Sequence, residues 1–388
     1  MWIESGSLAE LAFFPVMVVA IASGVSLLCT VLLWRTQKVS RDTAACFDRI
    51  ERVGFQSDPQ LRSLDKSVAL SVPPLPPPVA TPAGAAAGAV LPRKKPFEKG
   101  LVLIGGFGDM PHMWEGLAER ASKAGWYTLA PRTPGWGRTD FREANKVCWT
   151  DWVLACRDSL AVARGLCDEV TVVAHSTGAP VTALVAETQP IDRLIFTGPN
   201  FLSQAGDRWA KKLLLRPVVG PLVTKYLGTV VKKRRRGRPV DSLNVASYET
   251  AFYLTCLPVH TLRQMWILQD KLSRPWRVSG EVLMLMGEAD ESVAPLLEQA
   301  DFVRGYVPED VSFRACSIPN AAHGLPTETD GVVDTLAKIV VGGDEGLIDK
   351  LALLAEAKAA AAAGDPAATA YSATNGGGGP TNGNSDAH

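Results

Sequence analysis

Six short apolar runs, separated by segments with helical periodicity, recur along the middle of the chain. The runs cover residues 101–104, 126–129, 170–173, 193–196, 282–286 and 311–317. The intervening segments include two with a helical pattern, residues 152–165 and 179–187. Nearly continuous apolar strands that alternate with helices are typical of a parallel sheet buried on both faces. The pattern therefore predicts an α/β domain built on one mostly parallel sheet.

One interval breaks this alternation. About residues 201–276 separate two of the predicted strands, and this is too long for a single helical crossover. We interpret the interval as a cap inserted over the active edge of the sheet. The predicted domain then spans residues 97–342.

The N-terminal region contains a long apolar segment. Residues 11–34 include no charged side chain, and Trp34 ends the segment. About 20 apolar residues cross a bilayer as a helix, and tryptophan is enriched at the membrane interface. A cleavable signal peptide normally has a positive N-terminal flank, whereas Glu4 and Glu10 precede this segment. A buried helix of a soluble protein seldom stays uncharged for so long, so we predict a transmembrane anchor within residues 1–35.

The charges and cysteines suggest where the domain lies. Arg35, Lys38 and Arg41 follow the apolar segment, and basic flanks stay on the cytosolic side. The seven cysteines form neither a CxxC pair nor a Cys/His metal spacing, which fits a reducing compartment. We therefore predict a single-pass membrane protein with a cytosolic domain and no metal or organic cofactor.

The remaining segments differ in composition from the domain. Residues 36–96 are rich in proline and alanine, which is typical of a linker. Within residues 343–388, an alanine-rich helical stretch at about 347–363 gives way to a Gly/Asn/Ser tail that we expect to be disordered. Across all 388 residues, 40 basic and 40 acidic side chains cancel. This balance gives no support for nucleic acid as a partner.

A serine between small residues lies where a predicted strand passes into a predicted helix. The sequence around Ser176 is Ala-His-Ser-Thr-Gly, so Ala174 and Gly178 stand two positions either side of it. A sharp turn at this point needs small side chains there and presents the hydroxyl at the top of the sheet. The adjacent helix N-terminus also favours negative charge. We therefore predict that Ser176 is a nucleophile, although Ala174 replaces the more usual glycine.

A serine hydroxyl needs a base to take its proton. The chain has five histidines, His112, His175, His260, His323 and His388. His388 ends the predicted tail, and the ring of His175 should point into the core beside the serine. His323 follows the last predicted strand in a loop, after the serine in the chain, so we predict His323 as the base.

The base needs a carboxylate to orient it. The apolar run 282–286 is followed by an acidic loop with the pattern Gly-x-x-Asp-x-x-Val, which contains Asp290. The end of this strand would place Asp290 over the sheet. Glu288 and Glu291 are close competitors, for which a solvated loop position is the alternative.

Backbone amides must also stabilise the negative oxygen that forms during attack. A glycine-rich loop at residues 105–108 follows the first predicted strand. We expect the amides of Phe107 and Thr177 to be the donors. The loop lacks the Gly-Lys-Ser/Thr of a phosphate-binding loop and the three-glycine dinucleotide pattern.

These motifs, in this order, resemble the α/β-hydrolase superfamily over about residues 97–341. They include the glycine-rich loop, residues 134–139 (Pro-Gly-Trp-Gly-Arg-Thr) and the turn at Ser176. The resemblance implies an α/β-hydrolase fold, a catalytic triad of Ser176, Asp290 and His323, and an oxyanion hole. One departure is Gly105, where the family usually has a histidine.

Within that superfamily the chain looks most similar to the branch of monoacylglycerol lipases, lysophospholipases and S33-like serine aminopeptidases. A basic run, residues 232–238, follows apolar residues of the cap and suits contact with an anionic lipid surface. A solvated loop is the alternative for this run. We therefore expect an ester hydrolase that acts on an acyl lipid.

Two other functions stay open on the sequence alone. A peptidase or acyltransferase would differ only in the leaving group or the acceptor. A non-catalytic scaffold of the same fold, tethered to a membrane, is an alternative of another class. Such relatives usually lose a triad position, whereas all three are present here.

Overall fold

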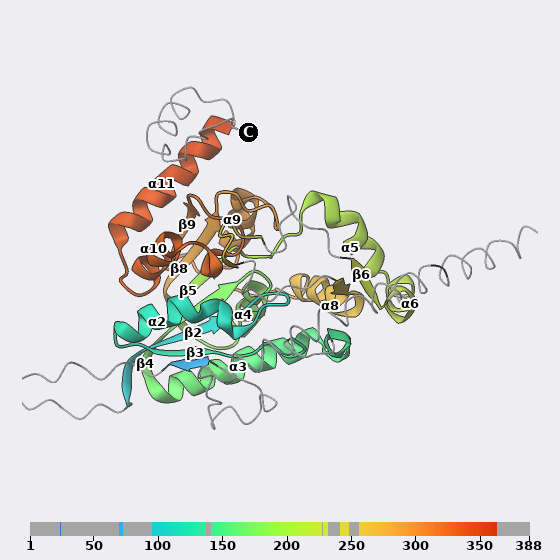
Figure 1. Ribbon diagram of the computed structural model, residues 1–388, viewed down its shortest axis with the longest axis horizontal. Helices are drawn as coiled ribbons and strands as arrows, with labels where there is room; N and C mark the ends of the chain where they lie inside the picture. The colour runs from blue at the N-terminus through green and yellow to red at the C-terminus, as the bar shows by residue number, and fades with distance from the viewer. Residues whose placement is uncertain are drawn as a thin grey trace, which may run out of the picture.

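The computed structural model describes residues 24, 70–72, 95–136, 141–226, 228–231, 241–247 and 256–362, and the structural statements below concern these residues. A seven-stranded sheet in the order β1-β3-β2-β4-β5-β8-β9 forms its centre (Figure 1). Its strands are β1 Leu70–Val72, β2 Phe97–Ile104, β3 Tyr127–Ala130, β4 Cys167–His175, β5 Ile191–Thr197, β8 Val278–Gly287 and β9 Ser312–Ile318. Every neighbouring pair is parallel except β1 with β3. The expected mostly parallel sheet is therefore confirmed.

Alternate side chains of the strands pack on opposite faces of the sheet, as the two-residue repeat of a strand requires. In β2, Leu101 and Leu103 belong to one apolar cluster, and Val102 and Ile104 belong to another. The first cluster is covered by α2 (Glu115–Lys123), α10 (Asp330–Val340) and α11 (Glu345–Ala362). The second is covered by α3 (Trp149–Leu166), α4 (Gly178–Ala186) and α9 (Leu296–Arg304). Because helices cover both faces of the sheet, side chains on both sides of the central strands are buried. This explains the continuous apolar runs in the sequence.

The register brings the carboxyl ends of the central strands to one edge. Ile104 of β2 pairs with Ala174 of β4, and His175 pairs with Thr197 of β5. Further along the sheet, Gly287 of β8 pairs with Ile318 of β9. Loops that leave these strands therefore begin side by side, and they carry the predicted site residues.

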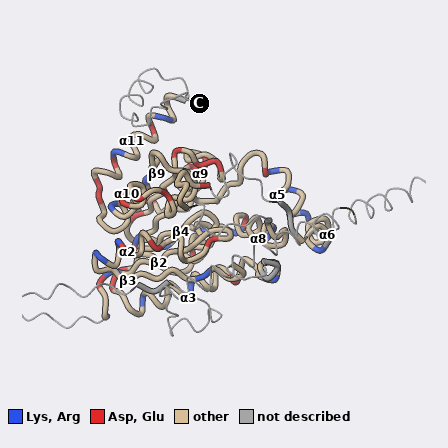
Figure 2. The backbone as a smooth tube through the Cα atoms, viewed as in Figure 1, with Lys and Arg blue, Asp and Glu red and all other residues tan. Residues whose placement is uncertain are grey.

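The interval between β5 and β8 holds the predicted insertion. It contains α5 (Arg208–Leu214), α6 (Val219–Tyr226), α8 (Val259–Gln269) and a small sheet of β6 (Thr229–Val231) with β7 (Cys256–Pro258). Figure 1 shows α5, α6 and α8 at one end of the molecule, apart from α2, α10 and α11. Lysine and arginine recur along α5 and α6 (Figure 2).

One strand differs from the sequence-based expectation. Residues 36–96 were expected to be a linker, yet Leu70–Val72 form β1, which pairs antiparallel with β3. Three residues followed by two prolines carry no strand signal of their own. An edge strand of this kind forms because β3 offers its free side, and proline is tolerated after an edge strand.

Several predicted segments lie outside the described residues. These are the anchor at 11–34 apart from Gly24, most of the linker, the basic run 232–238 and the tail from 363 onward. Among the residues that the structure describes, no helix combines the length and the apolar character needed to span a bilayer. The anchor and the outer domain boundaries therefore stay predictions.

Candidate active site

Ser176 lies in a strained turn between β4 and α4. Its φ angle is +50°, a left-handed conformation that costs a residue with a Cβ roughly 1–3 kcal/mol. Backbone hydrogen bonds hold the turn: the Ser176 amide donates to the carbonyl of Thr197 at 3.0 Å. The Ser176 carbonyl in turn accepts from the amides of Ala179 at 3.0 Å and Asn200 at 3.1 Å. The sharp turn expected from the sequence is therefore present.

The tight packing around the turn explains its small residues. A Cβ added to Gly178 would lie 2.7 Å from the carbonyl oxygens of Ile104 and Gly105, so only glycine fits there. Ala174 is fully buried in β4. A Cβ on Gly106 would lie 2.6 Å from that of Ser176, which brings the glycine-rich loop directly against the nucleophile.

The structure brings Ser176, His323 and Asp290 into one hydrogen-bonded chain. Nε2 of His323 lies 2.9 Å from Oγ of Ser176, and Nδ1 of His323 lies 2.8 Å from Oδ2 of Asp290. A carboxylate at Nδ1 favours the tautomer with its proton there, which leaves Nε2 free to accept the serine proton. Ser176 is 8% exposed, so it is largely buried.

Electrostatics within the triad favour a charged pair. Burial opposes protonation of His323, but the charge and hydrogen bond of Asp290, aided by Asp241 and Asp109, raise the pKa of His323. Burial likewise opposes ionisation of Asp290, yet His323 and the Ser292 amide, 2.8 Å from Oδ1, hold the pKa of Asp290 below its usual value. The site is therefore arranged to stabilise the imidazolium that forms when His323 takes a proton.

Glu288 and His175 do not belong to the hydrogen-bonded chain of the triad. Glu288 is exposed and forms an ion pair with Lys358 at 2.7 Å. His175 is buried beside Ser176, and its Nδ1 lies 2.9 Å from the carbonyl of Thr197. Burial lowers the pKa of His175 to about 4, so its ring is neutral at pH 7. The ring of His175 packs against the ring of His323 with 4.8 Å between the ring centroids, and this contact helps to hold His323 in place.

The glycine-rich loop after β2 is held by its own aspartate. The amide of Gly106 donates to Oδ2 of Asp109 at 2.7 Å, and this oxygen lies 3.7 Å from Nε2 of His175. Phe107, an expected oxyanion donor, follows Gly106, and its ring packs at a tilt of 58° against that of Trp136 with 4.7 Å between ring centroids. Thr177, the other expected donor, directly follows Ser176 at the start of α4. The sequence analysis did not identify Asp109.

Gly198 is a second residue that the sequence analysis missed. Its φ is +52°, and a Cβ there would lie 2.9 Å from Nδ1 of His323. The amide of Gly198 also donates to the carbonyl of Leu285 at 2.8 Å. A glycine directly after a predicted strand was the available signal, and the close approach of the His323 imidazole explains why glycine stands there.

Residues 241–247 of the insertion are tied to the loop that carries His323. The buried carboxylate of Glu328 accepts from the amides of Ala322 and Leu243, both at 2.9 Å, and of Asn244 at 3.2 Å. The amide of Gly324 donates to the carbonyl of Asp241 at 2.8 Å. These bonds join the elements on both sides of His323.

The loop that carries Asp290 is joined to the same segment. The hydroxyl of Ser292 donates to Oδ2 of Asp241, so the insertion also braces the acid of the triad. Neither Asp241 nor Glu328 belongs to a recognisable motif. Nothing in the sequence therefore pointed to either of them.

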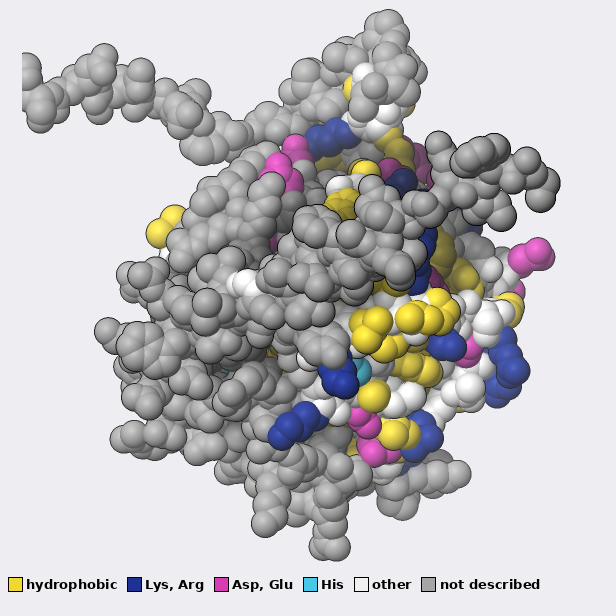
Figure 3. Space-filling model, turned by 90° about the vertical axis from the view of Figure 1, so that its right-hand side faces the viewer, with side chains coloured by type: hydrophobic (Ala, Val, Ile, Leu, Met, Phe, Trp, Pro, Cys, Tyr) yellow, Lys and Arg dark blue, Asp and Glu magenta, His cyan; other side chains and the backbone are white. Residues whose placement is uncertain are grey.

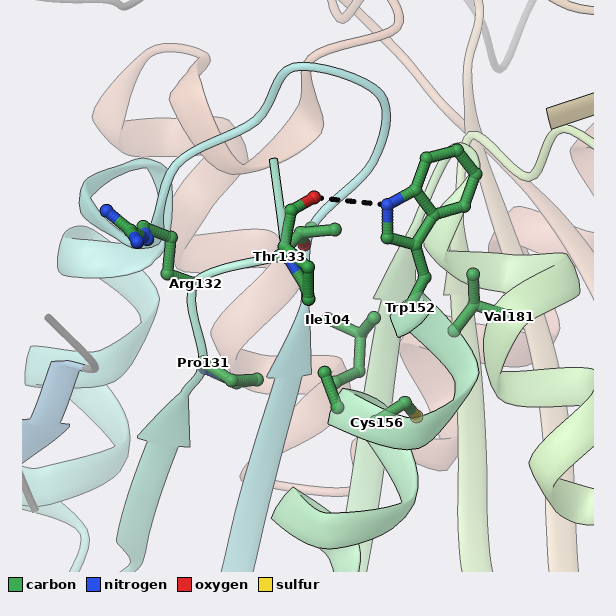
Figure 4. A pocket seen from close by; sticks show the side chains of 10 residues that line it. Ile104, Pro131, Arg132, Thr133, Trp152, Cys156 and Val181 are labelled. Carbon is green, nitrogen blue, oxygen red and sulfur yellow. Dashed lines mark hydrogen bonds between the residues drawn. The ribbon is translucent and has the colours of Figure 1, made fainter. Parts of the chain in front are cut away.

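A small cavity adjoins the glycine-rich loop between β2, β3, α3 and α4 (Figure 4). Its lining includes Ile104, Gly105, Trp152 and Cys156, and Nε1 of Trp152 donates to the carbonyl of Pro134 at 3.1 Å. No triad residue lines it. Burial raises the pKa of the Cys156 thiol to about 12, which leaves this cysteine unreactive at neutral pH.

In the part of the chain that is described, no group of three or more His, Cys, Asp or Glu side chains is arranged to hold a metal ion. The hydrogen-bonded serine, histidine and aspartate are the groups that covalent acyl transfer uses.

Comparisons with known proteins agree with this geometry. Residues 101–335 match the family model described as "Alpha/beta hydrolase family". A thermostable monoacylglycerol lipase from Bacillus sp. (strain H-257) is 31% identical over 91 residues, which cover 24% of this chain and 36% of that lipase. The match therefore spans little more than a third of the curated relative.

Solved structures share the fold at low identity. A thermostable carboxyl esterase from Bacillus coagulans, in complex with glycerol, has a TM-score of 0.53 and 14% identity, covering 72% of this chain and 94% of the esterase. A soluble variant of monoglyceride lipase from Saccharomyces cerevisiae has a TM-score of 0.51 and 14% identity, covering 72% and 92%. At such identities the likeness concerns the fold alone.

Proposed function

Because the chain belongs to the α/β-hydrolase family, we propose that it is a serine hydrolase that cleaves carboxylic esters of acyl lipids, such as monoacylglycerols or lysophospholipids. The observation that carries the proposal is the continuous hydrogen-bonded chain Ser176–His323–Asp290, with distances of 2.9 and 2.8 Å. A histidine that accepts from a serine on a strained turn is the arrangement that activates a hydroxyl for acyl transfer.

The first half of the reaction forms an acyl-enzyme. Oγ of Ser176 attacks the ester carbonyl as Nε2 of His323 takes its proton, and Asp290 stabilises the resulting imidazolium. The amides of Phe107 and Thr177 donate to the negative oxygen of the tetrahedral intermediate. His323 then returns the proton to the leaving alkoxide, which departs as an alcohol and leaves the acyl group on Ser176.

The second half restores the enzyme. His323 takes a proton from a water molecule, whose oxygen attacks the acyl carbonyl. Collapse of the second tetrahedral intermediate breaks the bond to Ser176, which recovers its proton from His323. The products are a fatty acid and an alcohol, and no metal or organic cofactor takes part.

The choice of a lipid ester rests on three observations. The matching relative is a monoacylglycerol lipase, and an insertion lies between β5 and β8 beside the triad. Residues 11–34 are an uncharged apolar segment of the length that crosses a bilayer. We propose that this segment anchors the chain, with the catalytic domain on the cytosolic side.

The test is a substrate panel on the full-length chain in detergent micelles. Monoacylglycerol, lysophospholipid, a short water-soluble ester and a peptide amide are compared, with Ser176→Ala as the control. The proposal predicts the highest kcat/KM on a long-chain ester and loss of turnover in Ser176→Ala. Preferred cleavage of the peptide amide would favour the peptidase, and absence of all turnover would favour the scaffold.

A further inference from the structure

The outer face of the insertion exposes large apolar side chains. Trp209 and Leu213 of α5 are 70% and 39% exposed, and Val218 and Leu222, before and within α6, are 71% and 50% exposed. The two members of each pair are four positions apart (i and i+4), which places both on the same side of a helical turn. We call these four residues, together with the basic residues between them, the cap face.

Basic residues are interspersed with these apolar residues along the chain. Residues 205–226 contain five basic side chains and one acidic one, although the whole chain is neutral. Arg208 pairs with Glu298 at 3.2 Å, and Lys211 pairs with Asp270 at 2.8 Å. Lys212 and Arg216 are exposed next to Leu213 and Val218.

Figures 2 and 3 show the end of the molecule that holds α5 and α6. Figure 2 shows basic positions along α5 and α6. Figure 3 looks onto this end of the molecule and shows hydrophobic side chains gathered beside lysines and arginines.

We propose that the cap face docks on an anionic lipid bilayer. Tryptophan is favoured at the headgroup level, and apolar side chains flanked by lysine and arginine are typical of surfaces that lie in a membrane interface. The basic groups complement the negative charge of a bilayer that contains phosphatidylserine. The centres of protein–protein interfaces are depleted of lysine, whereas exposed Lys212 directly precedes exposed Leu213 here, which favours a lipid surface over a protein partner.

The cap face is structurally connected to the nucleophile. Helices α5 and α6 pack on α8, and α8 packs on α3 and α4. From α8, Gln269 donates to the carbonyl of Asn200 at 2.8 Å, and the amide of Asn200 donates to the carbonyl of Ser176 at 3.1 Å. A bilayer held by α5 and α6 would therefore be linked through α8 to the turn that carries Ser176. Docking itself does not depend on the proposed hydrolysis, but its use in lipid delivery does.

Hydrogen–deuterium exchange on the full-length chain tests the proposal. The chain is reconstituted in vesicles of phosphatidylcholine alone and in vesicles with about one third phosphatidylserine. The predicted anchor is present in both, so a difference in exchange within residues 205–226 reports docking of the domain. We expect severalfold slower exchange in peptides of residues 205–226 with the anionic lipid, an effect that weakens at high salt. Equal exchange in both vesicles overturns the proposal.

Paired variants locate the effect. Trp209→Ser combined with Val218→Ser should abolish the lipid-dependent protection, whereas Leu353→Ser, at a 54% exposed position of α11, should leave it intact. Unchanged exchange in α3 and α4 shows that each variant is folded. Protection that survives the double substitution contradicts the proposal. In the unsubstituted chain, absence of lipid-dependent protection together with intact ester hydrolysis would reject docking alone, and protection without hydrolysis would reject the proposed reaction alone.

Discussion

The carboxylate of Asp109 accepts a hydrogen bond of 2.7 Å from the amide of Gly106, three residues earlier in the same loop. This bond holds the turn that directly precedes Phe107, whose amide we propose as an oxyanion donor. The sequence departs from its family at Gly105, where a histidine is usual, and a Cβ there would lie 3.1 Å from that of Asp109. Asp109 therefore holds the loop in place from the end opposite Gly105.

Replacing Asp109 tests this role. Asp109→Ala removes the acceptor and should lower kcat about tenfold with little change in KM, less than the roughly 10²–10³ for loss of an oxyanion donor. Asp109→Asn keeps an acceptor oxygen and should retain most activity. Steady-state kinetics on a short ester measure both, and equal losses in the two variants would argue against a positioning hydrogen bond.

Gly198→Ala should impair the base. The new Cβ would lie 2.9 Å from Nδ1 of His323, so the ring must move, and a displacement of about 1 Å costs roughly 100-fold in rate. Gly125→Ala is the matched control, because Gly125 also has a positive φ, +86°, but nothing within 4 Å. Both variants should lose stability in thermal unfolding, and only Gly198→Ala should lose kcat. Similar kcat values would refute the steric argument.

Glu328→Ala should destabilise the domain strongly. The substitution leaves the amides of Ala322 and Leu243 without their acceptor, whereas the amide of Asn244 keeps the hydroxyl of Ser242 at 3.1 Å. Each buried unpaired group costs about 1–3 kcal/mol, so denaturant unfolding should show a loss of about 2 kcal/mol or more. Glu298→Ala, which breaks only an exposed pair with Arg208, should change stability by less than about 1 kcal/mol. A loss for Glu328→Ala no larger than this would contradict the bracing role.

The rate should depend on pH through His323. Because the neutral imidazole accepts the serine proton, kcat/KM should fall as the pH drops through the pKa of His323. The carboxylates of Asp290, Asp241 and Asp109 raise this pKa, so the midpoint should lie above about 6.5, the value of free histidine. Asp241→Asn removes one charge and should move the midpoint to lower pH. A wild-type midpoint below 6.5, or an unshifted variant, would count against this electrostatic account.

Much of the fold could be predicted because burial on both faces leaves long apolar runs. All six predicted strands coincide with observed ones, whereas β1 owes its existence to pairing with β3. At the site, Ser176 and His323 stand in turns next to strands, where residue type and chain order are informative. Asp241 and Glu328 act through contacts between residues that are distant in the sequence. Leu243 and Glu328, for example, are hydrogen-bonded although they lie 85 residues apart, and no local sequence pattern indicates such contacts.

The central claim is that Ser176 is activated by His323. Labelling of the full-length chain with a fluorophosphonate, followed by mass spectrometry of its peptides, tests this most directly, because such a probe reacts with activated serines. The account predicts a single modified residue, Ser176, with labelling abolished in Ser176→Ala and greatly slowed in His323→Ala. A folded chain that stays unlabelled, or labelling that persists in Ser176→Ala, would contradict it.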